Sequence, residues 1–190
     1  MDALKEKICR EGKVLEGDVL RVDSFLNHQI DVGFLGEMGR EFYRLYCGCG
    51  VNKILTVESS GIGIACVTAQ FFNCPVVVAK KSKSSNMSSD VYVSGAWSYT
   101  HGNYYDITVS RDYIKETDCI LVIDDFLAKG NALHALLSII RESGAKLAGA
   151  GIVIEKAYQG GGDEIRAAGV RIESLASIAS MSVAEGIVFC

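Results

Sequence analysis

The sequence predicts an α/β protein with a mostly parallel, twisted sheet and helices on both faces of that sheet. Short apolar runs rich in β-branched residues, such as residues 76–79 and 120–123, are typical of strands that are buried on both faces. Segments whose apolar residues recur with a helical period separate these runs. From residue 53 onward strand and helix alternate, which is the pattern of βαβ units.

Length and composition are those of an ordinary folded domain. The chain has 190 residues, of which 49% are hydrophobic and 22% are charged, and this favours a single domain over residues 1–190. A net charge of −4 disfavours nucleic acid as the main partner. No apolar stretch approaches the roughly 20 residues of a membrane span, and the charged N-terminus does not resemble a signal peptide. We therefore expect a cytoplasmic protein with no membrane partner.

Seven cysteines are distributed along the chain, and several of them lie within apolar runs. The odd number and this distribution predict reduced thiols that are buried as small hydrophobic side chains. Cys47 and Cys49 form the one suggestive pair. One intervening residue is the wrong spacing for a zinc knuckle, and no second pair completes four ligands, so we predict no metal site there.

The N-terminal part of the chain precedes the alternation of strands and helices. Residues 2–12 are expected to form a short helix, with Asp2 as its N-cap and Gly12 at its end. Residues 14–31 have mixed polarity and no clear period. They are either an irregular connection on the surface or a cap over a pocket. Residues 31–46 are expected to follow as an amphipathic helix.

The remaining elements follow in order along the chain. Two segments of strand composition, residues 91–97 and 104–110, predict a hairpin that is preceded by a polar, mobile loop at residues 82–90. A helix is expected to begin at Ala132 and to end at Gly144. The other predicted strands lie at residues 53–57, 76–79, 120–125, 149–154, 170–175 and 187–189, and the other predicted helices at residues 62–72 and 163–168.

Three loops leave the carboxyl ends of predicted strands, at residues 58–63, 124–132 and 155–162. In a parallel sheet these ends lie along one edge, where ligands bind. The first loop lacks the third glycine of a dinucleotide fingerprint and the Gly-Lys-Ser/Thr of a Walker A loop. It is either a plain turn between strand and helix or a set of small residues that lets backbone N–H groups approach an anion.

Asp124 and Asp125 directly follow the apolar strand at residues 120–123. Two adjacent acids at such a place are costly unless they face a cation, water or hydroxyl groups. They are either a solvated or helix-capping pair, or ligands for sugar hydroxyls. The loop that follows adds a lysine and a glycine before a helix start, which suits a monophosphate. The cations at Lys80, Lys81 and Lys83 are either solvated charges or groups that close over a diphosphate.

The sequence from Leu121 to Gly130 resembles the signature of the type I phosphoribosyltransferases: an apolar strand, an acid pair, two apolar residues and a small loop with glycine. The resemblance covers almost the whole chain and is greatest to the members that act on xanthine. It implies the fold of that family, with a hood over the base at residues 13–31 and a flexible loop at the β-hairpin. The residues that carry it are 22–31, 58–62, 123–128 and 151–156.

The resemblance implies that the chain transfers a 5-phosphoribosyl group from phosphoribosyl diphosphate to xanthine. Mg²⁺ would be carried by oxygens of the diphosphate and ribose, without direct protein ligands, and a homodimer is implied in the same way. The alternatives are an enzyme for hypoxanthine or guanine, or a purine-responsive regulator that has the same fold and binds nucleic acid.

The roles that the resemblance implies are assigned residue by residue. Asp124 and Asp125 would hold the ribose hydroxyls, and Lys81 would reach the diphosphate, so these three are the expected catalytic residues. Leu20, Asn27 and Lys156 would contact xanthine. The residues implied to bind phosphoribosyl diphosphate are Ala128, Lys129, Gly130, Asn131 and Ala132 at the 5-phosphate and Ser59, Ser60 and Gly61 at the diphosphate.

Two features of the loop depart from the family's pattern. Lys129 and Asn131 replace a threonine and a glycine that are common in the wider signature, but the loop keeps its backbone N–H groups for a phosphate. Ala128 stands where hypoxanthine-guanine enzymes carry an aspartate placed to handle a purine proton. Because xanthine loses its proton more readily, we hypothesise that Ala128 favours a substrate that depends less on a protein base.

Overall fold

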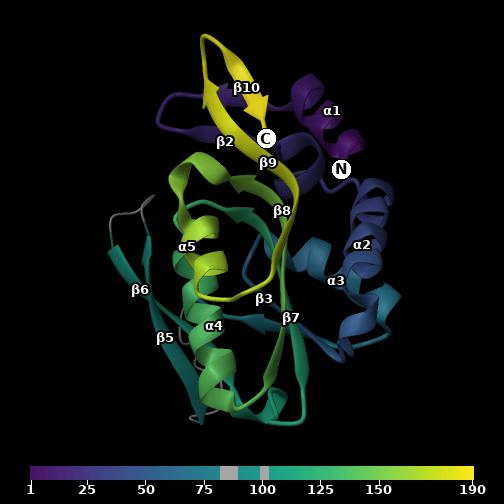
Figure 1. Cartoon of the computed structure of the whole chain (residues 1–190), viewed down its shortest axis with the longest axis vertical. Helices are drawn as coiled ribbons and strands as arrows, with labels where there is room; N and C mark the ends of the chain where they lie inside the picture. The colour runs from purple at the N-terminus through teal and green to yellow at the C-terminus, as the bar shows by residue number, and fades with distance from the viewer. Residues whose placement is uncertain (82–89, 99–102) are drawn as a thin grey trace.

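The structure, a computed structural model, describes residues 1–81, 90–98 and 103–190. Its centre is a six-stranded sheet in the order β10-β9-β8-β7-β3-β4, in which only β9 and β10 pair antiparallel (Figure 1). The predicted mostly parallel sheet is therefore confirmed. The strands are β3 (Lys53–Val57), β4 (Val76–Ala79), β7 (Cys119–Leu127), β8 (Lys146–Lys156), β9 (Ile172–Ser182) and β10 (Gly186–Phe189).

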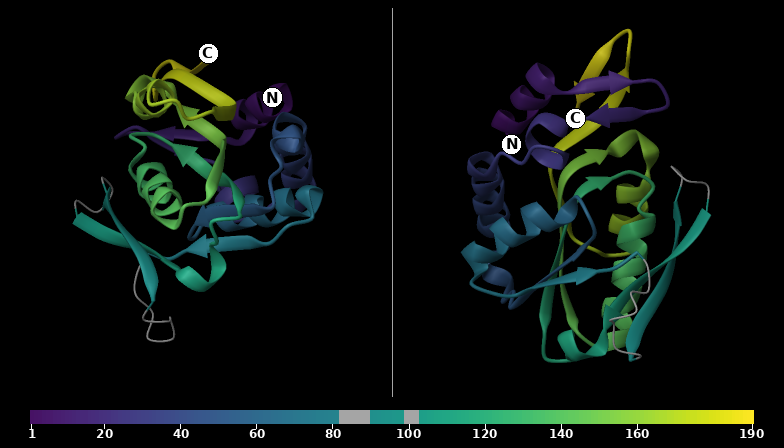
Figure 2. Two further views of the ribbon diagram at one scale, coloured as in Figure 1. Left: turned by 60° about the horizontal axis from the view of Figure 1, so that its bottom comes forward. Right: turned by 180° about the vertical axis from the view of Figure 1, so that it is seen from behind.

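Helices cover both faces of the sheet, as predicted (Figure 2). On one face lie α2 (Val32–Tyr46) and α3 (Gly61–Phe72), and on the other α4 (Asn131–Ser143) and the short α5 (Gly161–Ala167). Asp31 caps α2, because its side chain accepts a hydrogen bond from the backbone N–H of Phe34 at 3.1 Å. Gly144, in the left-handed conformation, ends α4 as predicted.

Strand β7 lies in the middle of the sheet and is buried on both faces. Ile120 and Val122 pack into the core beneath α4, while Leu121 and Ile123 pack into the core beneath α2 and α3. All four side chains are fully buried. A fully buried side chain of this kind contributes about 1.5–3 kcal/mol, so this strand anchors both halves of the core.

The N-terminal segment is more regular than its composition indicates. Helix α1 (Asp2–Glu11) begins with Asp2 inside it rather than as its N-cap. Strands β1 (Lys13–Leu15) and β2 (Val19–Arg21) form an antiparallel hairpin, and a turn of π-helix follows at Asp23–Asn27. Of the two alternatives for this region, the irregular connection is wrong, because strands of three residues are too short to show a period in the sequence, and the cap over a pocket stays a prediction.

The predicted hairpin over residues 91–110 is confirmed as β5 (Val91–Ser98) and β6 (Asn103–Ser110). It lies to one side of the sheet and packs against α4 (Figure 1). Paired backbone hydrogen bonds between Lys80 and Thr108 join β6 to the end of β4. The loop predicted before this hairpin and the turn expected between its strands lie mostly outside the described residues, as does Lys83.

The cysteines are free thiols, but the expectation that they are buried is largely wrong. Only Cys119 is buried, and Cys9, Cys47, Cys66 and Cys190 are exposed. Apolar neighbours in sequence do not bury a side chain that points away from the core on an amphipathic helix. Within residues 1–81, 90–98 and 103–190, no helix combines the length and the hydropathy needed to span a bilayer.

Substitution of Gly151 tests how closely α2 packs on the sheet. A Cβ at this position in β8 would lie 2.7 Å from Ile123 Cδ1 and 2.7 Å from Phe42 Cδ1. We expect Gly151→Ala to lower the free energy of unfolding in urea by about 1–3 kcal/mol. The control is Gly36→Ala in α2, where nothing lies within 4 Å of the added carbon and alanine favours helix by about 0.5–1 kcal/mol. Equal stability of Gly151→Ala and the unsubstituted protein would contradict the close packing.

Candidate active site

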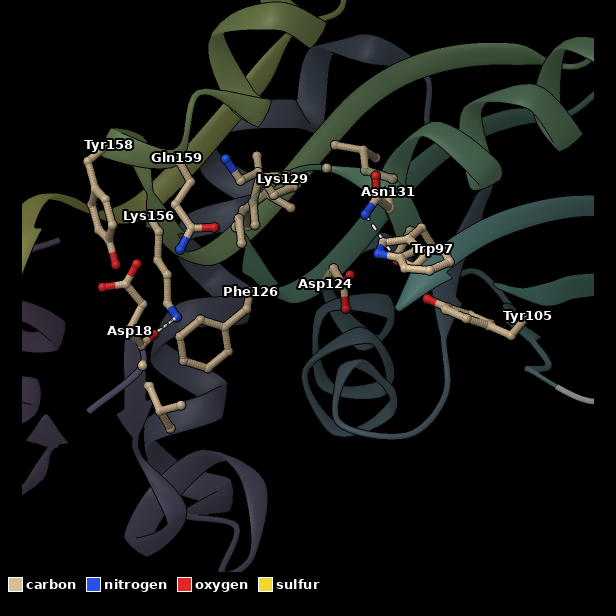
Figure 3. A pocket seen from close by; sticks show the side chains of 18 of the residues that line it. Asp18, Trp97, Tyr105, Asp124, Phe126, Lys129, Asn131, Lys156, Tyr158 and Gln159 are labelled. Carbon is tan, nitrogen blue, oxygen red and sulfur yellow. Dashed lines mark hydrogen bonds between the residues drawn. The ribbon is translucent and has the colours of Figure 1, made fainter. Parts of the chain in front are cut away.

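A cavity of about 710 Å³ opens at the carboxyl ends of the parallel strands, between the hairpin β1–β2, which belongs to the predicted hood, and the hairpin β5–β6 (Figure 3). Loops after β7 and β8 form its floor. This is the edge at which the sequence places the ligand. The side chains and backbone that line it belong to Gly17, Asp18, Val19, Lys81, Trp97, Tyr105, Asp124, Phe126, Leu127, Ala128, Lys129, Gly130, Asn131, Ala132, Leu133, Ile152, Lys156, Tyr158 and Gln159.

The loop between β7 and α4, called the anion cradle below, has a backbone geometry that suits an anion. Gly130 has φ +82°, which an L side chain rarely adopts, and turns the chain into the N-terminus of α4. A Cβ on Gly161, the first residue of α5, would lie 2.4 Å from the Ala128 carbonyl oxygen, so α5 packs directly against the loop. The free N–H groups and the dipole of the 13-residue α4 favour a negative group here.

Asn131 links this loop to the hairpin β5–β6. Its Nδ2 donates a hydrogen bond to the Trp97 carbonyl oxygen at 3.0 Å (Figure 3). The Trp97 ring packs edge-to-face on Tyr104, with ring centroids 4.7 Å apart. The side chain of Asn131 therefore helps hold one wall of the cavity, and the backbone of the loop remains the part that faces an anion.

The acid pair lies beside this cradle. Asp124 is 6% exposed, and its Oδ1 accepts the backbone N–H of Asp125 at 3.0 Å. Burial, followed by the charge of Asp125, raises the pKa of Asp124 well above its usual range, and burial also raises the pKa of Asp125. The nearby Lys81 ammonium opposes both shifts. The pair thus favours ligands that supply hydroxyl donors or positive charge.

The loop after β3 reaches the acid pair through Gly61. A Cβ on Gly61 would lie 2.3 Å from Thr56 Oγ1 and 2.9 Å from Asp124 Oδ1, so only glycine allows this approach. In the same loop, the Glu58 carboxylate accepts the backbone N–H of Lys81 at 2.7 Å and pairs with Lys80 at 3.1 Å. Although burial raises the pKa of Glu58, these two partners lower it overall. Glu58 therefore ties the chain that carries Lys81 to this loop.

The opposite end of the cavity is formed by Lys156 and aromatic side chains. Lys156 Nζ donates a hydrogen bond to the carbonyl oxygen of Asp18 in the hood, and it lies 5.9 Å from the centroid of the Phe126 ring (Figure 3). Burial lowers the pKa of Lys156. Tyr158 and Gln159 stand beside it. A flat, apolar face next to a cation and an amide suits an aromatic ring that carries oxygens.

Glu155 does not join this end of the cavity, although the sequence places it in the third loop at the strand ends. Its carboxylate receives two hydrogen bonds of 2.7 Å from Arg166 and one of 2.5 Å from Ser174. Successive side chains in a strand point to opposite faces, so Lys156 faces the cavity and Glu155 faces α5. Glu155 is thus part of the packing of α5.

The structure brings eight of the residues assigned from sequence to this one cavity. They are Lys81, Asp124, Ala128, Lys129, Gly130, Asn131, Ala132 and Lys156. Gly61 lies directly behind Asp124. Ser59, Ser60, Asp125, Leu20 and Asn27 are not among the lining residues; Leu20 is buried in the core, and Asn27 is exposed at the end of the π-helical turn. Lining the cavity does not test a role, so the binding and catalytic roles assigned to all of these residues stay predictions.

Several lining residues escaped the sequence reasoning. Phe126 directly follows the acid pair, and Tyr158 and Gln159 closely follow Lys156. Their proximity to these motifs is the one feature of the sequence that indicates a place at the site. Trp97 and Tyr105 come from the hairpin, and nothing in their local sequence indicates that the hairpin folds over the loop after β7.

A resident metal cage is not formed by the part of the chain that the structure describes. Within it, no group of three or more histidine, cysteine, aspartate or glutamate side chains is arranged to hold an ion. The two adjacent carboxylates at residues 124 and 125 are too few for a cage of protein ligands alone.

The fold and this site define a family of transferases. The model of the phosphoribosyl transferase domain matches residues 48–179, which is more than half of the chain. The chain belongs to this family.

Curated relatives extend the similarity over nearly the whole chain. The xanthine phosphoribosyltransferase of Ruminiclostridium cellulolyticum is 51% identical over 181 residues, which are 95% of each chain. The protein of the same name from Clostridioides difficile is 52% identical over 182 residues, covering 95% of this chain and 96% of its own.

Solved structures with the same fold are adenine phosphoribosyltransferases. The Giardia lamblia enzyme complexed with 9-deazaadenine matches with a TM-score of 0.78 over 92% of this chain and 97% of its own, at 17% identity. The Trypanosoma brucei enzyme matches with a TM-score of 0.77 over 92% of this chain and 79% of its own, also at 17% identity. At this identity the likeness concerns the fold.

Neutralisation of Asp124 and neutralisation of Asp118, which lies just before β7, should change the free energy of unfolding in opposite directions. At pH 7 we expect Asp124→Asn to raise the free energy of unfolding by on the order of 1 kcal/mol, because a carboxyl whose pKa is raised in the folded state destabilises that state when ionised. The gain should disappear as the pH falls through the raised pKa. Urea unfolding at several pH values measures this dependence.

The matched control for this substitution is Asp118→Asn, just before β7. Asp118 is also nearly buried, but it pairs with Lys53 Nζ at 2.6 Å and accepts the backbone N–H of Lys115 at 2.7 Å. Its neutralisation should lower the free energy of unfolding by about 1–3 kcal/mol. Destabilisation of similar size by both substitutions would contradict the strained burial of Asp124.

Proposed function

We propose that the chain transfers the 5-phosphoribosyl group of phosphoribosyl diphosphate to xanthine, giving xanthosine 5′-monophosphate and diphosphate, in purine salvage in the cytoplasm. The observation that carries the proposal is one cavity that has Asp124 and the N-terminus of α4 at one end and a cation beside an aromatic ring at the other. Relatives with this activity in their names, at about half identity over almost the whole chain, support the choice of xanthine.

The 5-phosphate would bind at the N-terminus of α4. Backbone N–H groups of residues 128–132 would donate to its oxygens, and the helix dipole adds to their attraction. Lys129 is exposed at this loop and supplies a further positive charge. The contact between the loop and the 5-phosphate would be the same in the ground and transition states. Its role would therefore be to orient the sugar for attack at its anomeric carbon.

The ribose would lie over the acid pair. Asp124 and Asp125 would accept hydrogen bonds from the two ribose hydroxyls, which meets the need for donors at carboxylates whose pKa burial has raised. Positive charge develops on the ribose ring as the diphosphate departs, and the two carboxylates would stabilise it. Lys81, together with Ser59, Ser60 and Gly61, would hold the departing diphosphate.

Mg²⁺ would be held mainly by oxygens of the donor and would supply positive charge against the leaving diphosphate. The residues of this chain that face it would be Asp124 and Asp125. The two acids are adjacent and lie next to the proposed ribose site, so the donor set of this chain suits a metal that the substrate carries.

The purine would lie against Phe126, with the Lys156 ammonium donating to an exocyclic oxygen. The hood, residues 13–31, would cover the base. Leu20 and Asn27 are the residues assigned to contact it. The turn at Gly17 and Asp18 lines the cavity. We take residues 1–190 as one catalytic domain that pairs as a homodimer; analytical ultracentrifugation tests the pairing.

The test of the proposed reaction is a panel of xanthine, guanine, hypoxanthine and adenine. Each purine is incubated with phosphoribosyl diphosphate and Mg²⁺, and diphosphate release is measured. We expect xanthine to have the highest kcat/KM. Higher turnover of guanine or hypoxanthine would overturn the substrate assignment, and turnover of none would overturn the reaction.

The same assay tests whether the lack of a carboxylate at position 128 favours xanthine as the substrate. We hypothesise that ionisation of xanthine itself replaces a protein base, so the rate with xanthine should rise with pH as free xanthine loses its proton. We expect Ala128→Asp to improve hypoxanthine relative to xanthine. A pH–rate profile for xanthine that follows a group of the enzyme instead would contradict this role.

Neutralising both acids, Asp124→Asn with Asp125→Asn, should lower kcat by about 10²-fold or more, because the positive ribose ring of the transition state then lacks its counter-charge. Rapid-quench measurement of xanthosine 5′-monophosphate tests this. A loss of less than about tenfold would contradict the assigned role.

Removal of the side chain of Lys156 tests the base end of the cavity. We expect Lys156→Ala to raise KM for xanthine by about tenfold or more, and to change KM for phosphoribosyl diphosphate much less. The matched control is Lys146→Ala, an exposed lysine at the other end of the same strand. An unchanged KM for xanthine in Lys156→Ala would refute the assignment.

A further inference from the structure

A buried hydroxyl that the mechanism does not yet use stands behind the acid pair. Thr56 in β3 is fully buried, and its Oγ1 has no hydrogen-bond partner among the described residues. Buried polar groups are nearly always bonded, because an unpaired one keeps the cost of leaving water. An exception near the carboxyl end of β3, beside Asp124, points to a partner that becomes available when a ligand binds.

Packing does not explain a threonine at this position. Thr56 faces the same side of β3 as Ile54, beneath α3, and its strand neighbours Leu55 and Val57 are also buried and apolar. Valine has nearly the same shape and the same preference for strands. The feature that distinguishes threonine here is the hydroxyl group.

The hydroxyl lies next to the most buried carboxylate of the site. An ideal Cβ on Gly61 would lie 2.3 Å from Thr56 Oγ1 and 2.9 Å from Asp124 Oδ1, so both oxygens flank the same α-carbon. Reorientation of the Asp124 carboxylate when a ligand binds would let the Thr56 hydroxyl donate to Oδ1. The lack of a side chain at Gly61 keeps this space open.

We propose that Thr56 is a positioning residue for Asp124: its hydroxyl donates to the ionised carboxylate when the ribose of phosphoribosyl diphosphate binds. This inference rests on the proposed function and deepens it. The donated hydrogen bond orients the carboxylate toward the ribose hydroxyls and stabilises its charge against the repulsion of Asp125. Without ligand the Thr56 hydroxyl stays unpaired. Ligand binding removes the cost of that unpaired buried group, and this favours the bound state.

The experiment compares two pairs of proteins, and in each pair one member has a hydroxyl at position 56 and the other lacks it. The pairs are the unsubstituted protein with Thr56→Val, and Thr56→Ser with Thr56→Ala. We expect kcat/KM for phosphoribosyl diphosphate to fall about tenfold in Thr56→Val and Thr56→Ala, the usual effect of one charge-assisted hydrogen bond. Thr56→Ser should keep most of the activity. Because valine replaces an unpaired hydroxyl by a methyl group, the melting temperature of Thr56→Val should equal or exceed that of the unsubstituted protein.

The pH dependence separates positioning from a structural effect. Removal of a donor raises the pKa of the carboxyl, so the acid limb of kcat/KM for phosphoribosyl diphosphate should move to higher pH in Thr56→Val and not in Thr56→Ser. The other groups that act on Asp124 are Asp125, Lys81 and Tyr105, and all are unchanged in these variants.

The chain offers a matched control in Thr68 of α3. It is the other fully buried threonine whose hydroxyl has no partner within the described ranges, and it packs against Gly39 of α2 instead of the site. Thr68→Val should leave kcat/KM and its acid limb unchanged. Equal activity of Thr56→Val and the unsubstituted protein, or equal losses in Thr56→Ser and Thr56→Val, would overturn the proposal.

Failure of the proposed function can be told apart from failure of this inference. Calorimetric titration with phosphoribosyl diphosphate and Mg²⁺ needs no purine. If the unsubstituted protein binds the donor but turns over no purine, the proposed reaction fails, and a tenfold weaker affinity in Thr56→Val still supports the role of Thr56. Equal donor affinity in the two proteins overturns it.

Discussion

The burial of Asp124 within β7, with the half-buried Asp125 next to it, is the constraint on which the site depends. The strand that carries them is apolar on both faces and lies in the middle of the sheet, so the backbone at Asp124 cannot move to relieve the charge. The core holds the pair in place, and Gly61, the first residue of α3, lies directly against Asp124. Burial raises the pKa of Asp124, so its ionised form is unfavourable in the folded state, and its carboxylate lines the cavity.

The segments outside the sheet are tied to this centre by a few polar contacts. Asn131 connects the anion cradle to the hairpin β5–β6, and Lys156 connects the base end to the hood turn at Asp18. Glu58 binds the backbone of Lys81 and so links the loop after β3 to the chain entering the hairpin. Each of these contacts joins residues far apart in sequence, and together they close the cavity around one site.

The alternation of side chains along a strand explains why the neighbouring residues 155 and 156 have different roles. Alternation along β8 sends Lys156 into the cavity and Glu155 to the opposite side, where Arg166 and Ser174 satisfy its charge. A carboxylate with three donors is stable when buried, so Glu155 secures α5, and the start of α5 in turn presses on the anion cradle through Gly161. A motif that is continuous in sequence is thus divided between binding and support.

The sequence by itself determined the sheet, its buried central strand, the helices on both faces and the loop at residues 124–132, because these depend on local periodicity and turn chemistry. It also placed Asp124, the anion cradle and Lys156 at one edge, since parallel strands end together. Only the tertiary structure decided that three-residue strands form the hood hairpin, that Trp97 and Tyr105 wall the cavity, and that Glu155 faces away from it. It also revealed that the Thr56 hydroxyl lies unpaired behind Asp124 within the described residues. These features arise from contacts between distant segments, and local sequence carries no record of them.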